Sequence, residues 1–198
     1  MPLYRVLLAS VVLFLFASGA SAVTLNVVGG QLVGAFDVDV GGQLYNVAFE
    51  DGSCVDLFAG CDAVSDFAFQ DLASAIAASQ SLFDMVLLDV GEGAFDSAPE
   101  LTQGCHIEAL NRCLIFTPYA PRPEGGAIKV DISAAYNNDG DSEFEDWIWN
   151  TSVNENTYDW TESGEGVYAV WAPVPEPTTA VLLGLGLAGL AVRRRRLN

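Results

Sequence analysis

The densest group of side chains that could bind an ion lies between residues 137 and 146. This stretch packs five acids, two amides and a glycine into ten residues. Ca²⁺ prefers about six to eight oxygen ligands on a flexible loop. The EF-hand spacing is not met, because Ala135 stands where the first ligand belongs when the glycine is aligned. The stretch therefore predicts a solvated acidic turn, or a calcium loop of another kind with Asp139, Asp141 and Glu143 as ligands.

Groups that could catalyse a reaction are less distinct. His106 is the only histidine, and its neighbour Cys105 is expected to be oxidised, so a histidine-activated nucleophile has little support. The chain holds no Gly-x-Ser-x-Gly sequence. Glycoside hydrolysis needs two carboxyl groups about 5 to 10 Å apart, and 26 acidic residues will supply such pairs by chance. We expect no catalytic residue and no cofactor; the alternative is a secreted hydrolase that uses an acidic pair.

The four tryptophans, Trp147, Trp149, Trp160 and Trp171, all lie in the last third of the chain. Trp147 and Trp149 are two residues apart, so on a strand they share a face. Exposed, they would form a platform for sugar rings or an adhesive patch. Buried, they would be ordinary core, which we expect because a small domain needs its large apolar residues inside.

The four cysteines are Cys54, Cys61, Cys105 and Cys113. An even count in an exported chain predicts two disulfides. Three pairings are open, and Cys54–Cys61 with Cys105–Cys113 is preferred because short loops close easily. A zinc site is the alternative, but the spacing and the single histidine do not favour it.

The elements that must carry these residues are mostly strands. The segments 23–28, 36–40 and 44–49 alternate or run apolar, and Gly41-Gly42 between the last two is typical of a hairpin. Further strands are expected at 114–117, ended by prolines, and at 127–136, 144–149 and 167–171.

One amphipathic helix is expected from Ser65 or Asp66 to about Ser79, because apolar residues recur there at helical spacing. Residues 85–88 read as a further helical turn or a strand, and 106–112 as a short helix after a loop over 91–104. The fold class is therefore α+β, with a mainly antiparallel sheet of about six to eight strands and one main helix.

The N-terminus reads as a secretory signal peptide over residues 1–22. Arg5 supplies the positive charge, residues 6–16 are almost wholly apolar, and Ala20-Ser21-Ala22 is a small-x-small cleavage site. A mature α+β domain is expected over residues 23–172, outside the cytoplasm.

The C-terminus has three parts in order. Pro175, Glu176 and Pro177 precede an apolar run over residues 178–192, and Arg193, Arg194, Arg195 and Arg196 follow it. Fifteen apolar residues make a helix of roughly 22 Å, shorter than a bilayer core of about 30 Å. Arginines resist crossing and stay on the cytoplasmic side. We therefore expect a marginal transmembrane helix with an arginine stop-transfer block.

Residues 173–198 resemble the PEP-CTERM sorting domain. The resemblance implies that an exosortase recognises Pro175, Glu176 and Pro177, cuts near them and releases the protein or transfers it to the cell surface. It also implies transient residence in the inner membrane and an association with exopolysaccharide and biofilm matrix. It covers about an eighth of the chain and assigns no function to the domain before it.

The net charge of the chain limits the kinds of partner that it can bind. All 26 acidic residues lie between residues 23 and 177, where only Arg112, Arg122 and Lys129 are basic, so this segment carries a charge of about −23. Such a surface repels nucleic acid and anionic membranes and favours cations or basic partners. The sequence predicts a noncatalytic, exported surface or matrix protein with a carbohydrate or calcium contact.

Overall fold

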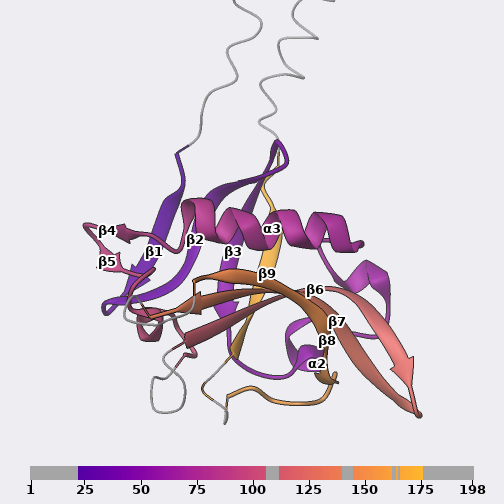
Figure 1. Ribbon diagram of the computed structural model, residues 1–198. Coiled ribbons are helices and arrows are strands. Elements are labelled where there is room, and N and C mark those ends of the chain that lie inside the picture. The colour runs from indigo at the N-terminus through magenta and orange to yellow at the C-terminus, as the bar shows by residue number, and fades with distance from the viewer. Residues whose placement is uncertain (1–21, 106–111, 140–144, 162–163, 165, 176–198) are drawn as a thin grey trace, which may run out of the picture.

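The computed structural model describes residues 22–105, 112–139, 145–161, 164 and 166–175. It confirms a mostly β structure with one main helix, in the α+β class. Figure 1 shows a twisted sheet with that helix, α3 (Leu72–Met85), lying across one face. The expected signal helix, the apolar C-terminal run and His106 lie outside the described residues. Within those described, no helix is long and apolar enough to cross a membrane.

Seven strands form the main sheet in the order β1-β2-β3-β9-β6-β7-β8. Their bounds are β1 (Thr24–Val28), β2 (Gln31–Val40), β3 (Gln43–Glu50), β6 (Arg112–Glu124), β7 (Ala127–Asn138), β8 (Trp147–Glu155) and β9 (Gly166–Pro173). All neighbours pair antiparallel except β6 and β9, which are parallel. The last strand in sequence therefore lies in the middle of the sheet, between two three-stranded meanders.

The predicted hairpin around Gly41-Gly42 is confirmed. Val40 pairs with Gln43, and both glycines have positive φ, of 64° and 92°. A two-residue turn with positive φ at both positions matches the twist of the flanking strands, and glycine adopts it without steric cost.

The strand expected at 114–117 is longer than the sequence indicated. β6 continues through Pro118, Pro121 and Pro123, which lie opposite residues of β7. The prolines are tolerated because β9 pairs with β6 only from Leu114 to Phe116, so the other side of β6 is open beyond that point. The expected helix over 106–112 falls mostly outside the described residues, and Arg112 itself opens β6.

The main helix begins later and ends later than expected. Asp71 caps it, because its side chain accepts a hydrogen bond from the Ser74 N–H at 2.9 Å. Residues Val64–Asp66 form a separate 3-10 turn, η2. The chain between has no regular structure, and it places Phe67 and Phe69 in different buried clusters. The helix runs to Met85, so residues 86–88 add neither a further turn of it nor a strand.

The predicted loop over 91–104 contains short regular elements. β4 (Asp89–Val90) and β5 (Gly93–Ala94) form a small hairpin, and η3 (Pro99–Leu101) follows as a 3-10 turn. In Figure 1 the hairpin projects from one end of the sheet.

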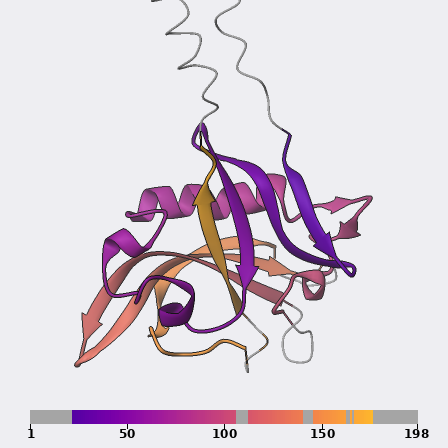
Figure 2. The ribbon, with the colours of Figure 1, turned by 180° about the vertical axis from the view of Figure 1, so that it is seen from behind.

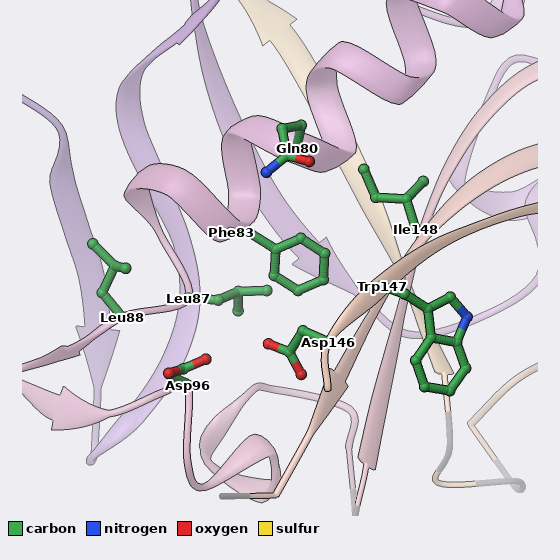
Figure 3. A pocket seen from close by; sticks show the side chains of 8 residues that line it. All are labelled: Gln80, Phe83, Leu87, Leu88, Asp96, Asp146, Trp147 and Ile148. Carbon is green, nitrogen blue, oxygen red and sulfur yellow. The ribbon is translucent and has the colours of Figure 1, made fainter. Parts of the chain in front are cut away.

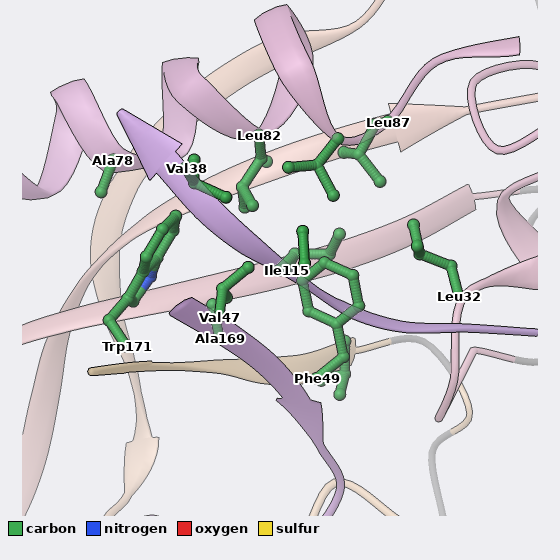
Figure 4. Close-up of a cluster of buried hydrophobic side chains, with 14 of the residues drawn as sticks. Leu32, Val38, Val47, Phe49, Ala78, Leu82, Leu87, Ile115, Ala169 and Trp171 are labelled. Atoms are coloured by element: carbon green, nitrogen blue, oxygen red, sulfur yellow. The ribbon is translucent and has the colours of Figure 1, made fainter. Parts of the chain in front are cut away.

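The larger core lies between the sheet and α3. Figure 4 shows side chains from α3, such as Ala78 and Leu82, above sheet residues that include Val38, Ile115 and Trp171. All of these are at most 7% exposed. Burying an aliphatic side chain contributes roughly 1.5–3 kcal/mol, so this contact is the main source of stability for α3.

A second cluster lies on the opposite face of the sheet, seen from behind in Figure 2. It is covered by the short helix α2 (Cys54–Leu57) and by residues 156–161, which lead back from β8 toward β9. Two backbone hydrogen bonds join these segments: the Val55 N–H donates to the Asn156 carbonyl, and the Trp160 N–H donates to the Gly52 carbonyl. This second layer is thinner than the helical one and leaves part of the face uncovered.

The two preferred cysteine pairings are confirmed. The sulfurs of Cys54 and Cys61 lie 1.93 Å apart, and those of Cys105 and Cys113 lie 2.00 Å apart. The first bridge closes the α2 loop over the second cluster. The other ties the chain before residue 106 to the start of β6.

Replacing Cys54 and Cys61 together by alanine should lower the free energy of unfolding by about 2–3 kcal/mol, because an eight-residue loop is no longer closed in the unfolded chain. Urea denaturation of the exported protein measures the loss. Peptide mapping without reduction checks the pairing directly. A peptide that links Cys61 to Cys105 would contradict it.

Candidate functional site

An aromatic strip lies on β8, the strand at one edge of the sheet. Trp147 and Trp149 of β8 are 39% and 45% exposed, so the expectation that they are core residues is wrong. They are exposed because β8 is an edge strand and the α2 layer does not reach across it. Trp171 does meet that expectation: it is buried in the larger core, and its indole N–H donates to the Thr117 hydroxyl at 3.2 Å.

Neighbouring side chains pack against the strip and hold its rings in place. Tyr136 of β7 lies opposite Trp147 in the strand register, and their rings stack with centroids 4.4 Å apart and an interplanar angle of 15°. Trp149 meets the same tyrosine ring edge to face at 5.7 Å. The Arg112 guanidinium carbon lies 5.4 Å from the Tyr136 ring centroid. Such contacts hold aromatic rings in defined orientations, so the two exposed indoles are presented by packed neighbours.

The aromatic surface continues toward the centre of the sheet. Phe116 of β6 is separated from Trp149 in its register row by Ala134, whose side chain is small. Trp160 packs on Phe116 at 4.7 Å, and Tyr158 packs on Trp160 at 4.9 Å. Tyr158 is 40% exposed. Rings from β6, β7, β8 and the segment after β8 thus occupy one face.

The side chains beneath that face are buried. Burial raises the pKa of the Tyr168 hydroxyl to about 12, because ionisation would place a charge among apolar rings. Tyr168 contacts Phe58 and Phe116, with ring centroids 5.7 Å away in both cases. The exposed rings therefore form the outer edge of a continuous aromatic cluster.

A pocket of about 290 Å³ opens on the other side of β8, next to the C-terminal half of α3. Figure 3 shows the Asp96 and Asp146 carboxyl groups on one side of it and apolar side chains on the other. Its lining residues are Gln80, Phe83, Leu87, Leu88, Asp96, Asp146, Trp147 and Ile148.

The two carboxyl groups of this pocket interact. The pKa of Asp146 is raised from an ordinary value of 3.8 to about 6, chiefly by burial and also by the charge and side-chain hydrogen bond of Asp96. The Asn138 N–H, which donates to Asp146 Oδ1 at 2.7 Å, acts in the opposite direction. A carboxyl pair in direct hydrogen-bonding contact is closer than the separation of about 5 Å or more that glycoside hydrolysis uses.

The predicted calcium ligands are only partly described. Asp139 follows the end of β7, whereas Asp141 and Glu143 lie outside the described residues. Where the structure does describe the chain, no three His, Cys, Asp or Glu side chains gather in an arrangement that could hold a metal ion. The calcium loop thus stays a prediction.

The start of the predicted sorting segment is held by the sheet. The Val174 N–H donates to the Leu44 carbonyl at 2.9 Å, and the Gln43 side chain donates to the Val174 carbonyl at 3.3 Å. Pro175 is the next residue and the last that is described there. The fold is thus a sheet domain tied by two disulfides, and its strand β9 leads directly into the predicted C-terminal signal.

That signal is of a known kind. Residues 173–196 match the family model of the PEP-CTERM protein-sorting motif. The chain is therefore a protein with a PEP-CTERM motif, which implies export and recognition by an exosortase. No curated protein and no solved structure matches the chain. The signal peptide, the stop-transfer role of the arginines and the exact cleavage sites stay predictions.

Sequence reasoning missed the pocket and the supports of the strip. Asp146 was visible as one acid of a run, but Asp96 lies 50 residues away in a loop, and no local pattern links the two. Arg112 and Trp147 both meet Tyr136 only through the pairing of β6, β7 and β8. The usable signal was the Trp-x-Trp spacing of residues 147 and 149, since a strand of that pattern at a sheet edge exposes both rings.

The Asp146→Asn variant should gain stability relative to the natural protein as the pH rises from about 4 to 7. The folded protein holds a proton on Asp146 that the unfolded chain releases above its ordinary pKa of 3.8. The stability that this proton contributes to the natural protein is thus complete below about pH 4 and is lost as the pH passes about 6. Asparagine keeps the acceptor for the Asn138 N–H and has no charge to bury. Urea denaturation at several pH values measures the difference.

Asp71→Asn is the matched control with the opposite sign. The hydrogen bond from the Ser74 N–H lowers the pKa of Asp71, so that variant should lose stability relative to the natural protein as the pH rises through the acidic range. If both variants shift in the same direction, general charge repulsion explains the data and the pair has no special role.

Proposed function

We propose that this is a noncatalytic protein of the cell surface or extracellular matrix, delivered by exosortase sorting and associated with exopolysaccharide. The observation that carries the proposal is the PEP-CTERM motif at residues 173–196, which begins at the last residue of the central strand β9. Two disulfides support an oxidising destination. The inner membrane holds the protein only during processing.

The geometry at the junction supports processing close to the motif. The last backbone hydrogen bond of the sheet region belongs to Val174, one residue before Pro175. Pro175 has no backbone N–H, so it cannot donate a further hydrogen bond to β3. Cutting after Val174 would leave β9 and all of its pairings within the released domain. A cut inside β9 would remove residues from the middle of the sheet.

The exported surface that remains suits a matrix. An acidic domain with a charge of about −23 stays soluble and resists nonspecific association. The exposed indoles of Trp147 and Trp149 provide apolar area of the kind that contacts sugar rings.

The intact mass of the protein from its host, with and without the exosortase, tests the sorting step. We expect a chain that begins near Val23 and ends near the Pro175–Pro177 motif in the normal host, and a retained tail when the enzyme is absent. Glu176→Ala should also retain the tail, whereas the matched control Glu155→Ala, at an exposed position in the domain, should be processed normally. A tail present in every host would indicate a simple C-terminally anchored protein.

A second candidate function is a secreted hydrolase that uses the carboxyl pair in the pocket, even though hydrogen-bonded carboxyl groups lie closer together than the pairs that usually cleave glycosides. A carboxyl group can act as a general acid or base when its pKa is near the working pH, and a pKa of about 6 places Asp146 near neutral pH.

The natural protein should release no new reducing ends from the host's exopolysaccharide, since the proposed role is noncatalytic. A reducing-end assay with matched Asp146→Asn protein measures this. Release by the natural protein that disappears in Asp146→Asn, while Trp149→Ala remains active, would replace the matrix role with the hydrolase.

A further inference from the structure

We propose that the strip formed by Trp147, Trp149 and Tyr158 is a binding surface for a polysaccharide that carries free amino groups. The inference rests on the proposed association with exopolysaccharide and names its site and the chemical class of its ligand. It follows from three properties of the strip: ring orientation, spacing and surrounding charge.

Ring orientation leaves aromatic faces available. Trp147 stacks one face on Tyr136 and is still 39% exposed. Trp149 contacts Tyr136 edge to face and is 45% exposed. Indoles held in this way lose little conformational entropy when a ligand binds, because their neighbours already fix them.

Spacing suits an extended polymer. Alternate residues of a strand repeat at roughly 7 Å, so a glycan that passes along the strip meets both indoles. Their planes are steeply inclined, because Trp147 lies at 15° and Trp149 at 77° to the same Tyr136 ring. Tyr158 lies farther across the same face, on Trp160. An extended chain can therefore follow the aromatic surface from the sheet edge inward.

Charge selects among glycans. Glu145, two residues before Trp147, is exposed, and so is Asp159 beside Tyr158. Of the three cations of the domain, Arg112 lies against the Tyr136 ring, and Arg122 and Lys129 pair with Asp131 and Glu124 toward the far end of the β6–β7 hairpin.

An anionic polysaccharide would be repelled by this surface, whereas protonated amino groups would meet carboxylates and the negative faces of indoles. A second copy of the chain, added edge to edge along β8, would bring like charges together. Charge complementarity therefore favours an amine-bearing glycan over the other occupants of an open strand edge.

The test uses the exported protein purified from its exosortase-bearing host, with a glucosamine hexamer as the probe at pH 6. Tryptophan fluorescence and calorimetry should both report binding that weakens as salt is raised. The fully N-acetylated hexamer, which has the same rings without the charge, should bind about tenfold more weakly.

Trp149→Ala should lower affinity for the glucosamine hexamer by about tenfold, and Trp149→Phe should retain most of it. Phe36→Ala is the matched control, because Phe36 is also 45% exposed but lies on β2 at the other side of the sheet; it should bind normally. The near-ultraviolet circular dichroism and thermal transition of each variant establish that it is folded.

The outcomes separate the two proposals. Equal binding of both hexamers would overturn the preference for amines and leave the polysaccharide association standing. Binding that Trp149→Ala does not weaken would overturn the strip as the site. No binding to either hexamer would overturn this inference, while the mass analysis of exosortase processing still decides the sorting role independently.

Discussion

The pairing of β9 with β3 on one side and β6 on the other is the contact on which the rest of the structure depends. The two meanders, β1-β2-β3 and β6-β7-β8, have no strand pairing with each other; both are joined through the last strand. Val167, Ala169 and Trp171 of β9 face the larger core, and Tyr168 faces the second cluster. The two meanders therefore cannot join into one sheet until β9, at the end of the domain, has been made. Its pairing with both of them buries both faces of β9 at once.

This topology also sets where the sorting motif begins. Because β9 is parallel to β6 and hence runs in the same direction as β8, the chain after β8 must return along the length of the sheet before β9 can start. The return places Trp160 over Phe116. Figure 1 shows that the first described residues and the end of β9 emerge on the same side of the molecule. A domain tethered at that side would direct the opposite end of its sheet, and the β6–β7 hairpin, away from the membrane.

The sequence predicted the parts that depend on local pattern. The Gly41-Gly42 turn, the alternating strands and the short-range disulfides all follow from chemistry within about ten residues. It failed where distant pairing decides. Local pattern makes the prolines of β6 look like the end of a strand, because their tolerance depends on how far β9 pairs along β6. Local pattern also starts the main helix too early, because the burial of Phe67 and Phe69 in different clusters depends on distant strands. The terminal motif was recognisable because its three parts are contiguous in sequence, unlike the Asp96–Asp146 pair.

The exposed tryptophans are best understood as a consequence of unequal covering. On the helical face, α3 lies across β2, β6 and β7 and closes the core (Figures 1 and 4). On the other face, α2 and the return segment cover Leu114, Phe116 and Tyr168 but stop before β8. A protein that needed only stability would place small or polar residues on such an edge, because exposed apolar edge strands promote aggregation. The observed edge instead carries two indoles braced by Tyr136, with carboxylates at both ends of the strand. Acidic flanks discourage pairing between copies while leaving the rings accessible, which is the combination expected of a surface that binds a ligand other than itself.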